Sequence, residues 1–96
     1  FLDRWGLTDP VDRKWVWENL TDMPLLASTE PLSAPRDAAR SLPRTFIDLT
    51  APKNPGTVLA SKRAREEGFK MLAIATGHDV MVTKPAKLAE LLLQAP

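Results

Sequence analysis

The only histidine of the chain, His78, lies in the stretch MLAIATGHDVM (residues 71–81), and Asp79 follows it directly. An imidazole can accept and return a proton near neutral pH. A single histidine that follows an apolar run and a glycine is therefore a candidate general base. A loop histidine with no catalytic role is the simpler alternative. The elements that position the loop decide between the two.

Composition limits the classes of protein that fit the chain. Its 96 residues suit one small domain. Its 13 basic and 12 acidic residues give a formal net charge of +1, which does not favour a nucleic-acid partner. With one histidine and no cysteine, no metal site is expected, and no cofactor is implied.

The ends and the apolar stretches of the chain give further expectations. No apolar stretch is long enough to span a bilayer, so we expect no membrane partner. The absence of cysteine is compatible with a cytoplasmic location, which we expect. The chain begins with Phe1 rather than Met, which suggests a piece of a longer protein.

The first half, residues 1–44, is rich in tryptophan, proline and charge. Within it, GLTDPVDRKWVWENL predicts a helix that Thr8 or Asp9 caps and Pro10 begins. Val11, Trp15 and Leu20 fall at roughly helical spacing and predict an apolar face, which Val16 and Trp17 widen. The prolines that follow predict an irregular connection, with one helical turn at residues 34–40.

The second half alternates strand and helix patterns. The expected elements, in order, are strand 45–50, helix 57–67, strand 69–76 and helix 83–95. A crossover helix makes the two strands parallel and the connection right-handed. The predicted fold class is therefore α/β, with the run 71–75 covered on both faces of the sheet.

Two of these helices carry their own start, stop and packing signals. In the first, Thr57 is the expected cap and Gly68 the expected left-handed end. Its inner stripe is predicted to be Leu59, Ala60 and Ala64. In the last helix, Thr83 is the expected cap, Pro85 lies in the first turn, and the packing residues are Leu88, Leu91 and Leu92.

Two strands do not make a stable parallel sheet, because such sheets need several strands to shield their edges. We therefore expect an upstream segment of the same protein, or a partner chain, to complete the sheet. In open parallel sheets, ligands bind at the carboxyl ends of the strands. His78 follows the second strand by two residues, so it lies at that edge, where Gly77 lets the backbone turn.

At this point the sequence resembles the α/β-hydrolase superfamily, closest to bacterial relatives of the plant methylesterase and hydroxynitrile lyase group. The pattern GHD.M.T.P..LA.LL carries the resemblance, which covers essentially the whole chain. It implies that residues 1–44 are the end of the cap and a connection, and that 45–96 are the C-terminal β-α-β-α portion of the hydrolase core.

The resemblance implies a serine-dependent esterase with His78 as the general base and a small-molecule ester as substrate. A hydroxynitrile lyase reaction on the same fold would use the same histidine. The family places its nucleophile in a G-x-S-x-G elbow. None of the four serines lies in such a motif, so the nucleophile would come from elsewhere.

The triad acid is not where the resemblance implies. The loop after strand 45–50 reads APKNPG and holds no carboxylate. The alternatives are Asp48 inside the strand, Asn54 as an uncharged orienting group, and an acid from an upstream segment. Asp79 adjoins His78, but neighbours on a loop usually point apart. We take Asp48 as the candidate.

Three more residues are candidates for a substrate pocket: Trp15, Trp17 and Met81. Tryptophans at helical spacing more often pack in a core, and we favour packing for Trp15 and Trp17. Because fold does not determine function, two rival readings stay open. One is a non-catalytic protein that binds a small molecule on the hydrolase fold, which the missing acid supports. The other is a small interaction module unrelated to hydrolases.

Overall fold

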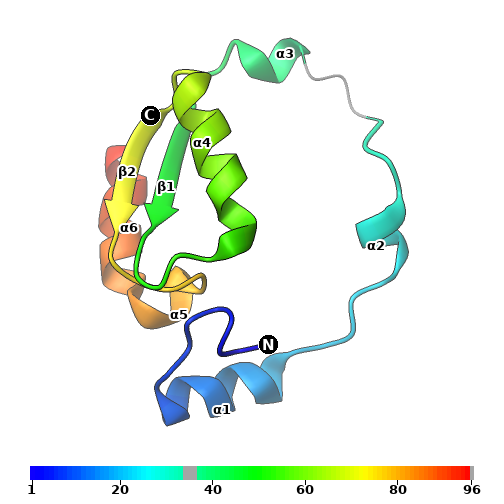
Figure 1. Ribbon diagram of the computed structural model, residues 1–96, viewed down its shortest axis with the longest axis vertical. Coiled ribbons are helices and arrows are strands. Elements are labelled where there is room, and N and C mark those ends of the chain that lie inside the picture. Colours follow the sequence, from blue (N-terminus) through cyan, green and yellow to red (C-terminus); the bar gives the residue numbers. More distant parts are fainter. Residues whose placement is uncertain (34–36, 96) are drawn as a thin grey trace.

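The predicted parallel strand pair is present in the computed structural model, which describes residues 1–33 and 37–95 (Figure 1). The two strands pair in register from Thr45 opposite Lys70 to Leu49 opposite Ile74. A crossover helix connects them, as a parallel pair requires. In broad terms the chain is therefore α/β, as expected. The strands are β1 (Thr45–Leu49) and β2 (Lys70–Ile74).

The helices follow the chain in an order close to the prediction. They are α1 (Pro10–Asn19), α2 (Leu26–Thr29), α3 (Asp37–Arg40), α4 (Val58–Glu66), α5 (Val80–Thr83) and α6 (Pro85–Gln94), with a 3₁₀ turn, η1 (Pro55–Thr57), before α4. Helix α2 was not predicted. Of the turn predicted at 34–40, residues 34–36 lie outside the described residues, and α3 accounts for the rest. The predicted final helix is two helices, because Pro85 begins a new one.

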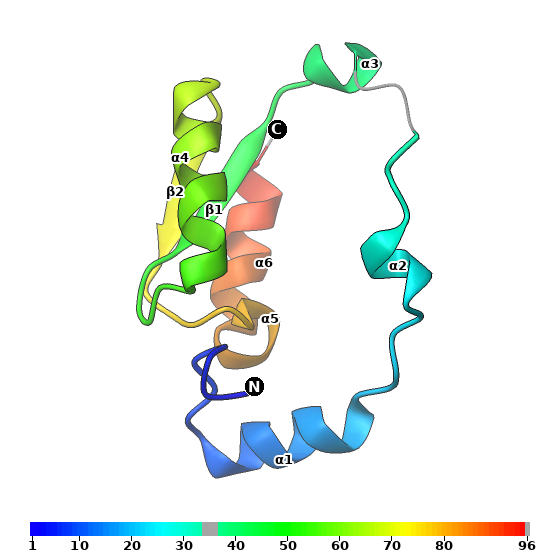
Figure 2. The ribbon, with the colours of Figure 1, turned by 45° about the vertical axis from the view of Figure 1, so that its right-hand side comes forward.

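Helices cover both faces of the strand pair, as predicted. α4 lies on one face and α6 on the other (Figures 1 and 2). On the α6 side, a core of Ile74, Val80 and Leu91 is extended by Ile47, Leu49, Leu72 and Leu88. On the α4 side, Ser61 and Ala64 are buried. The cover is incomplete, since Ala73 and Ala75 of the predicted buried run are exposed.

A second core holds the N-terminal segment and α1 together. It consists of Leu2, Leu7 and Val16, with Trp5 and Val82 packed against it. Asp9 caps α1 as expected, because its carboxylate accepts hydrogen bonds from the amides of Val11 and Asp12. The apolar face predicted for α1 is buried only at Val16. Its other members are exposed: Val11, Trp15, Trp17 and Leu20.

The packing stripes of α4 and α6 are narrower than predicted. In α4, Ala64 is buried but Leu59 and Ala60 are exposed, and the polar Ser61 takes an inner position. In α6, Leu91 is buried and Leu88 partly buried, while Leu92 is exposed. Two strands offer each helix too little sheet to cover a wide stripe.

The caps of α4 and α6 also differ from the prediction, apart from Gly68. Gly68 ends α4 in the left-handed region with φ +76°, as predicted. Thr57 makes no side-chain cap, and its hydroxyl donates to the Asn54 carbonyl instead. Thr83 belongs to α5 rather than capping α6.

The chain is more open than a packed domain of its length. Its radius of gyration is 15.3 Å, whereas about 12–13 Å is typical of 96 residues in a compact domain. All residues of the segment 20–33 are exposed, and this segment and α2 lie well away from the sheet (Figure 2). Within the described residues, each strand of the pair also has one unpaired edge. Such exposed edges are sites of pairing with further strands.

Two glycines in the left-handed region provide a matched test of the packing around the N-terminal segment. Gly6 has φ +78° and Gly68 has φ +76°, so alanine at either position costs about 1–2 kcal/mol in backbone conformation. A Cβ on Gly6 would also lie 2.6 Å from Cγ of Pro52, whereas one on Gly68 meets nothing within 4 Å. We expect Gly6→Ala to destabilise the chain by about 1–3 kcal/mol more than Gly68→Ala. Urea unfolding of the two variants measures this, and equal losses would refute the close contact.

Candidate functional site

The carboxyl ends of β1 and β2 meet at one edge of the sheet, where both strand arrows point toward α5 (Figure 1). The loops that leave the strands are joined by backbone hydrogen bonds. The amide of Thr50 donates to the Ile74 carbonyl at 3.0 Å, and that of Ala51 to the Thr76 carbonyl at 3.2 Å. The loop from Thr76 to Asp79 therefore lies beside the loop that follows β1, as the sequence predicts for His78.

The backbone of the N-terminal segment holds the His78 loop. The amide of His78 donates to the Trp5 carbonyl at 2.7 Å. Gly77 makes this approach possible, since a Cβ there would lie 2.5 Å from the Trp5 oxygen and 2.9 Å from Cα of Gly6. The glycine before the histidine is thus required by close packing of two backbone segments. On the other side, the hydroxyls of Thr76 and Thr83 are 2.5 Å apart and tie the loop to α5.

The half-buried imidazole of His78 lies near the Trp5 ring and also lines a pocket beside β1. Its ring is 5.9 Å from the Trp5 ring, at an interplanar angle of 49°. It also lines a pocket of about 180 Å³ together with Asp48, Asn54 and Thr57, and with Phe46, Ile47 and Leu49 of β1. We call this the His78 pocket. Because consecutive residues of β1 line it, although their side chains alternate between the two faces, the pocket lies along the unpaired edge of β1.

Asp48, the candidate acid, is buried beside this pocket and is engaged elsewhere. Its Oδ2 accepts hydrogen bonds from Nζ of Lys53 and Oγ of Ser61, each at 3.0 Å. Its Oδ1 is buried and has no partner among the residues that the structure describes. Within the same residues, no hydrogen bond joins Asp48 to the His78 ring.

The surroundings of Asp48 favour its ionised form. Burial by itself raises the pKa of this carboxyl group. The hydrogen bonds from Lys53 and Ser61, with the positive charges of Lys53 and Arg65, outweigh burial and hold the pKa below its usual value. Asp48 therefore has the properties of a buried structural anion. The sequence could not identify Lys53 as its partner, because the loop that brings them together has no distinctive pattern.

The structure also shows the positions of Asn54 and Asp79, the two other residues of the chain that could orient the His78 ring. Asn54 lines the His78 pocket, but its side-chain oxygen accepts a hydrogen bond from the Gly56 amide at 2.8 Å and caps η1. Asp79 accepts no side-chain cap hydrogen bond from α5, and its Oδ2 is buried without a partner in the described part of the chain. Burial raises the pKa of Asp79, and the charge of His78 offsets this only in part.

The three pocket candidates are divided between two other hollows. Trp15 and Met81 come together in a hollow of about 250 Å³ that Trp5 and Asp79 also line. Trp17 lies in a different hollow, with Phe1. Trp15 and Trp17 are 58% and 67% exposed, so packing in a core, which the sequence favoured, is not observed.

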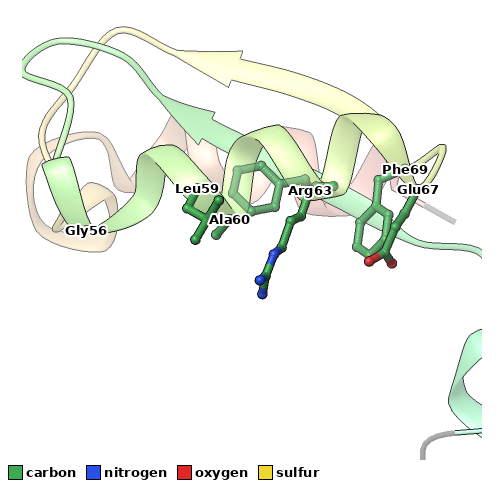
Figure 3. Close-up of a pocket in the computed structure, with 8 residues that line it drawn as sticks. Gly56, Leu59, Ala60, Arg63, Glu67 and Phe69 are labelled. Atoms are coloured by element: carbon green, nitrogen blue, oxygen red, sulfur yellow. The ribbon is translucent and has the colours of Figure 1, made fainter.

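A further hollow, of about 390 Å³, lies between β1 and the outer side of α4 (Figure 3). Leu59, Ala60 and Arg63 of α4 project to the same side there, with Phe69 and Glu67 at the far end of the helix (Figure 3). Phe46 lines both this hollow and the His78 pocket, so apolar surface continues along β1 from one to the other.

No family model, curated protein or solved structure matches the chain. Across residues 1–33 and 37–95, no group of three or more acidic or histidine side chains is placed to hold a metal ion. In the same part of the chain, every helix is too short or too polar to cross a membrane.

The two buried carboxyl groups should affect stability in opposite directions with pH. The pKa of Asp48 is below 3.8, its value outside the fold, so its contribution to stability is present above that pH and is lost as the pH falls through the lowered pKa. The pKa of Asp79 is above 3.8, so its ionisation lowers stability as the pH rises through the raised pKa.

Unfolding free energies of the variants against pH measure both effects. Asp48→Asn should lose most stability near neutral pH and progressively less as the pH falls below about 4. Asp79→Asn should gain relative to the parent chain as the pH rises above about 4. Curves that run parallel to that of the parent chain would contradict these assignments.

Proposed function

We propose that this chain supplies the general base, His78, of a serine-dependent hydrolase that cleaves carboxylic esters. One observation carries the proposal: the single imidazole of the chain lies on the loop at the carboxyl edge of a parallel strand pair, in a pocket that runs along an unpaired strand edge. Ligands bind at this edge in open parallel sheets. The resemblance of the His78 loop to that of α/β-hydrolases supports the same role.

The chemistry needs a nucleophile, which would come from a segment that completes the sheet. No serine of the described residues lines the His78 pocket. Ser61 is buried, and its hydroxyl donates a hydrogen bond to Asp48. The continuous apolar surface along β1, from the His78 pocket to the hollow beside α4, is the surface that a further strand would cover. We infer that an upstream segment or a partner chain pairs with β1 and brings the nucleophile beside His78.

In the proposed reaction, His78 moves one proton in each half. It accepts the proton of the serine hydroxyl as the oxygen attacks the ester carbonyl, and it returns that proton to the leaving alcohol when the ester bond breaks. Water then releases the acyl group from the serine, with His78 again acting as base and then acid. The fixed backbone of residues 77 and 78 supports this role, because a proton carrier must hold its position through both halves.

A second candidate function is a small-molecule binder on the same fold. The observation that favours it is the surroundings of the His78 ring, which donates no hydrogen bond to a carboxylate in the described residues. Without such a partner the imidazolium formed in catalysis is less well stabilised.

The test is hydrolysis of short p-nitrophenyl esters by the full-length protein, together with the segment or partner chain that we propose completes the sheet, with and without a serine-directed organophosphate. We expect turnover that the organophosphate abolishes, and we expect His78→Ala to lower kcat by about 10⁴–10⁶. Turnover that survives His78→Ala would remove His78 from the mechanism. Absence of turnover, with binding retained, would favour the binder.

Asp48→Asn is the matched variant, because it alters the other titratable residue of the His78 pocket. Asp48 is bound to Lys53 and Ser61 rather than to His78, so we expect its loss to change kcat by less than about tenfold while it lowers stability. A fall of about 10⁴ in kcat, as when a triad acid is replaced, would instead make Asp48 the acid that orients His78.

A further inference from the structure

The hollow beside α1 and α5 combines aromatic walls with an unpaired acid. Trp5, Trp15, Met81 and Val82 supply its apolar lining, and Asp79 is the only ionisable residue among those that line it. We call it the Trp15 hollow. Its volume of about 250 Å³ suits a small organic molecule. It is separate from the His78 pocket, and Trp5 lies between the two, since it lines this hollow and contacts the His78 ring.

Asp79 lacks the partners that a buried carboxyl group usually has. Its Oδ2 is buried and has no hydrogen-bond donor, and in the described residues no side-chain hydrogen bond and no ion pair with lysine or arginine involves its carboxylate. Among the described residues, His78, its neighbour in the chain, is the charged group that lowers the pKa of Asp79. A carboxylate held without donors beside an apolar hollow is destabilised, and a cation that enters the hollow relieves this.

We propose that the Trp15 hollow binds a small organic ammonium ion with an aromatic or aliphatic body, with the charge placed at Asp79 and the body on the indole rings. The two parts of the ligand match the two parts of the site. An ammonium ion donates charge-assisted hydrogen bonds to a carboxylate, and indole faces attract cations and apolar groups alike. A neutral alcohol of the same shape would gain the apolar contact but not the ionic one.

This site does not depend on the proposed hydrolase activity, because binding needs no nucleophile. Binding of an amine without ester hydrolysis would support the hollow and count against the proposed function. Hydrolysis without amine binding would do the reverse.

The experiment measures ligand binding by tryptophan fluorescence in the full-length chain. Trp17 lies outside the hollow, so Trp17→Phe leaves Trp5 and Trp15 as the reporters in the sequence described here. The probes are phenethylamine, 2-phenylethanol and phenylacetate, which share an aromatic body and differ in charge. We expect the amine to bind at least about tenfold more tightly than the alcohol, and the carboxylate probe to bind weakest.

Two acid variants locate the charge that the amine recognises. Asp79→Asn should reduce the preference for the amine over the alcohol to about one, because it removes the charge and keeps the shape. The control, Asp22→Asn, removes an exposed acid that lines the hollow of Trp17 instead and should leave the preference unchanged. A third variant, Trp15→Leu, should weaken the binding of both the amine and the alcohol, because the exposed Trp15 ring lines the hollow and contacts the body that the two probes share.

The proposal is overturned if the alcohol or the carboxylate probe binds as tightly as the amine, or if none of the three gives a saturable signal at millimolar concentration. It is also overturned if a folded Asp79→Asn variant keeps the preference for the amine. If Asp79→Asn does not fold, the order of affinities of the three probes for the Trp17→Phe variant decides whether the proposal stands.

Discussion

The arrangement depends on one contact between two stretches of backbone far apart in the sequence. The carbonyl of Trp5 accepts a hydrogen bond from the His78 amide, and the Gly6 and Gly77 backbones pass too closely for any side chain on Gly77. This contact fixes the loop that carries the imidazole. It also sets Trp5 against both the His78 ring and the Trp15 hollow. The small core around Leu7 adds a second connection, because Val82 of α5 packs against it.

The strand pair positions the loop but does not enclose it. α4 and α6 cover the two faces, whereas the edge of β1 beside the His78 pocket remains unpaired (Figure 1). The exposed leucines of α6 and the exposure of residues 20–33 have the same physical cause, since two strands offer too little apolar surface to bury them. A further strand paired with β1 would both extend the sheet and close the His78 pocket.

Sequence patterns predicted the local structure better than the packing. Strand composition, the crossover helix and the signals at Asp9, Pro10 and Gly68 depend on neighbouring residues, so they could be read directly. The buried positions of α1 and α4 were predicted only in part, since Val16 and Ala64 are buried while other residues of the predicted faces are exposed. Periodicity shows that a face is apolar and not whether a partner covers it. The position of His78 followed from strand direction. The Lys53 and Ser61 partners of Asp48, and the Trp5 carbonyl, come from tertiary contacts that carry no sequence pattern.

Amide hydrogen exchange at His78, followed by NMR in the full-length chain, tests the contact between the two backbone stretches most directly. A donor held at 2.7 Å from the Trp5 carbonyl should exchange far more slowly than an amide in an unstructured peptide. Exchange at the unprotected rate, in a chain whose β1 and β2 amides remain protected, would show that the N-terminal segment does not hold this loop.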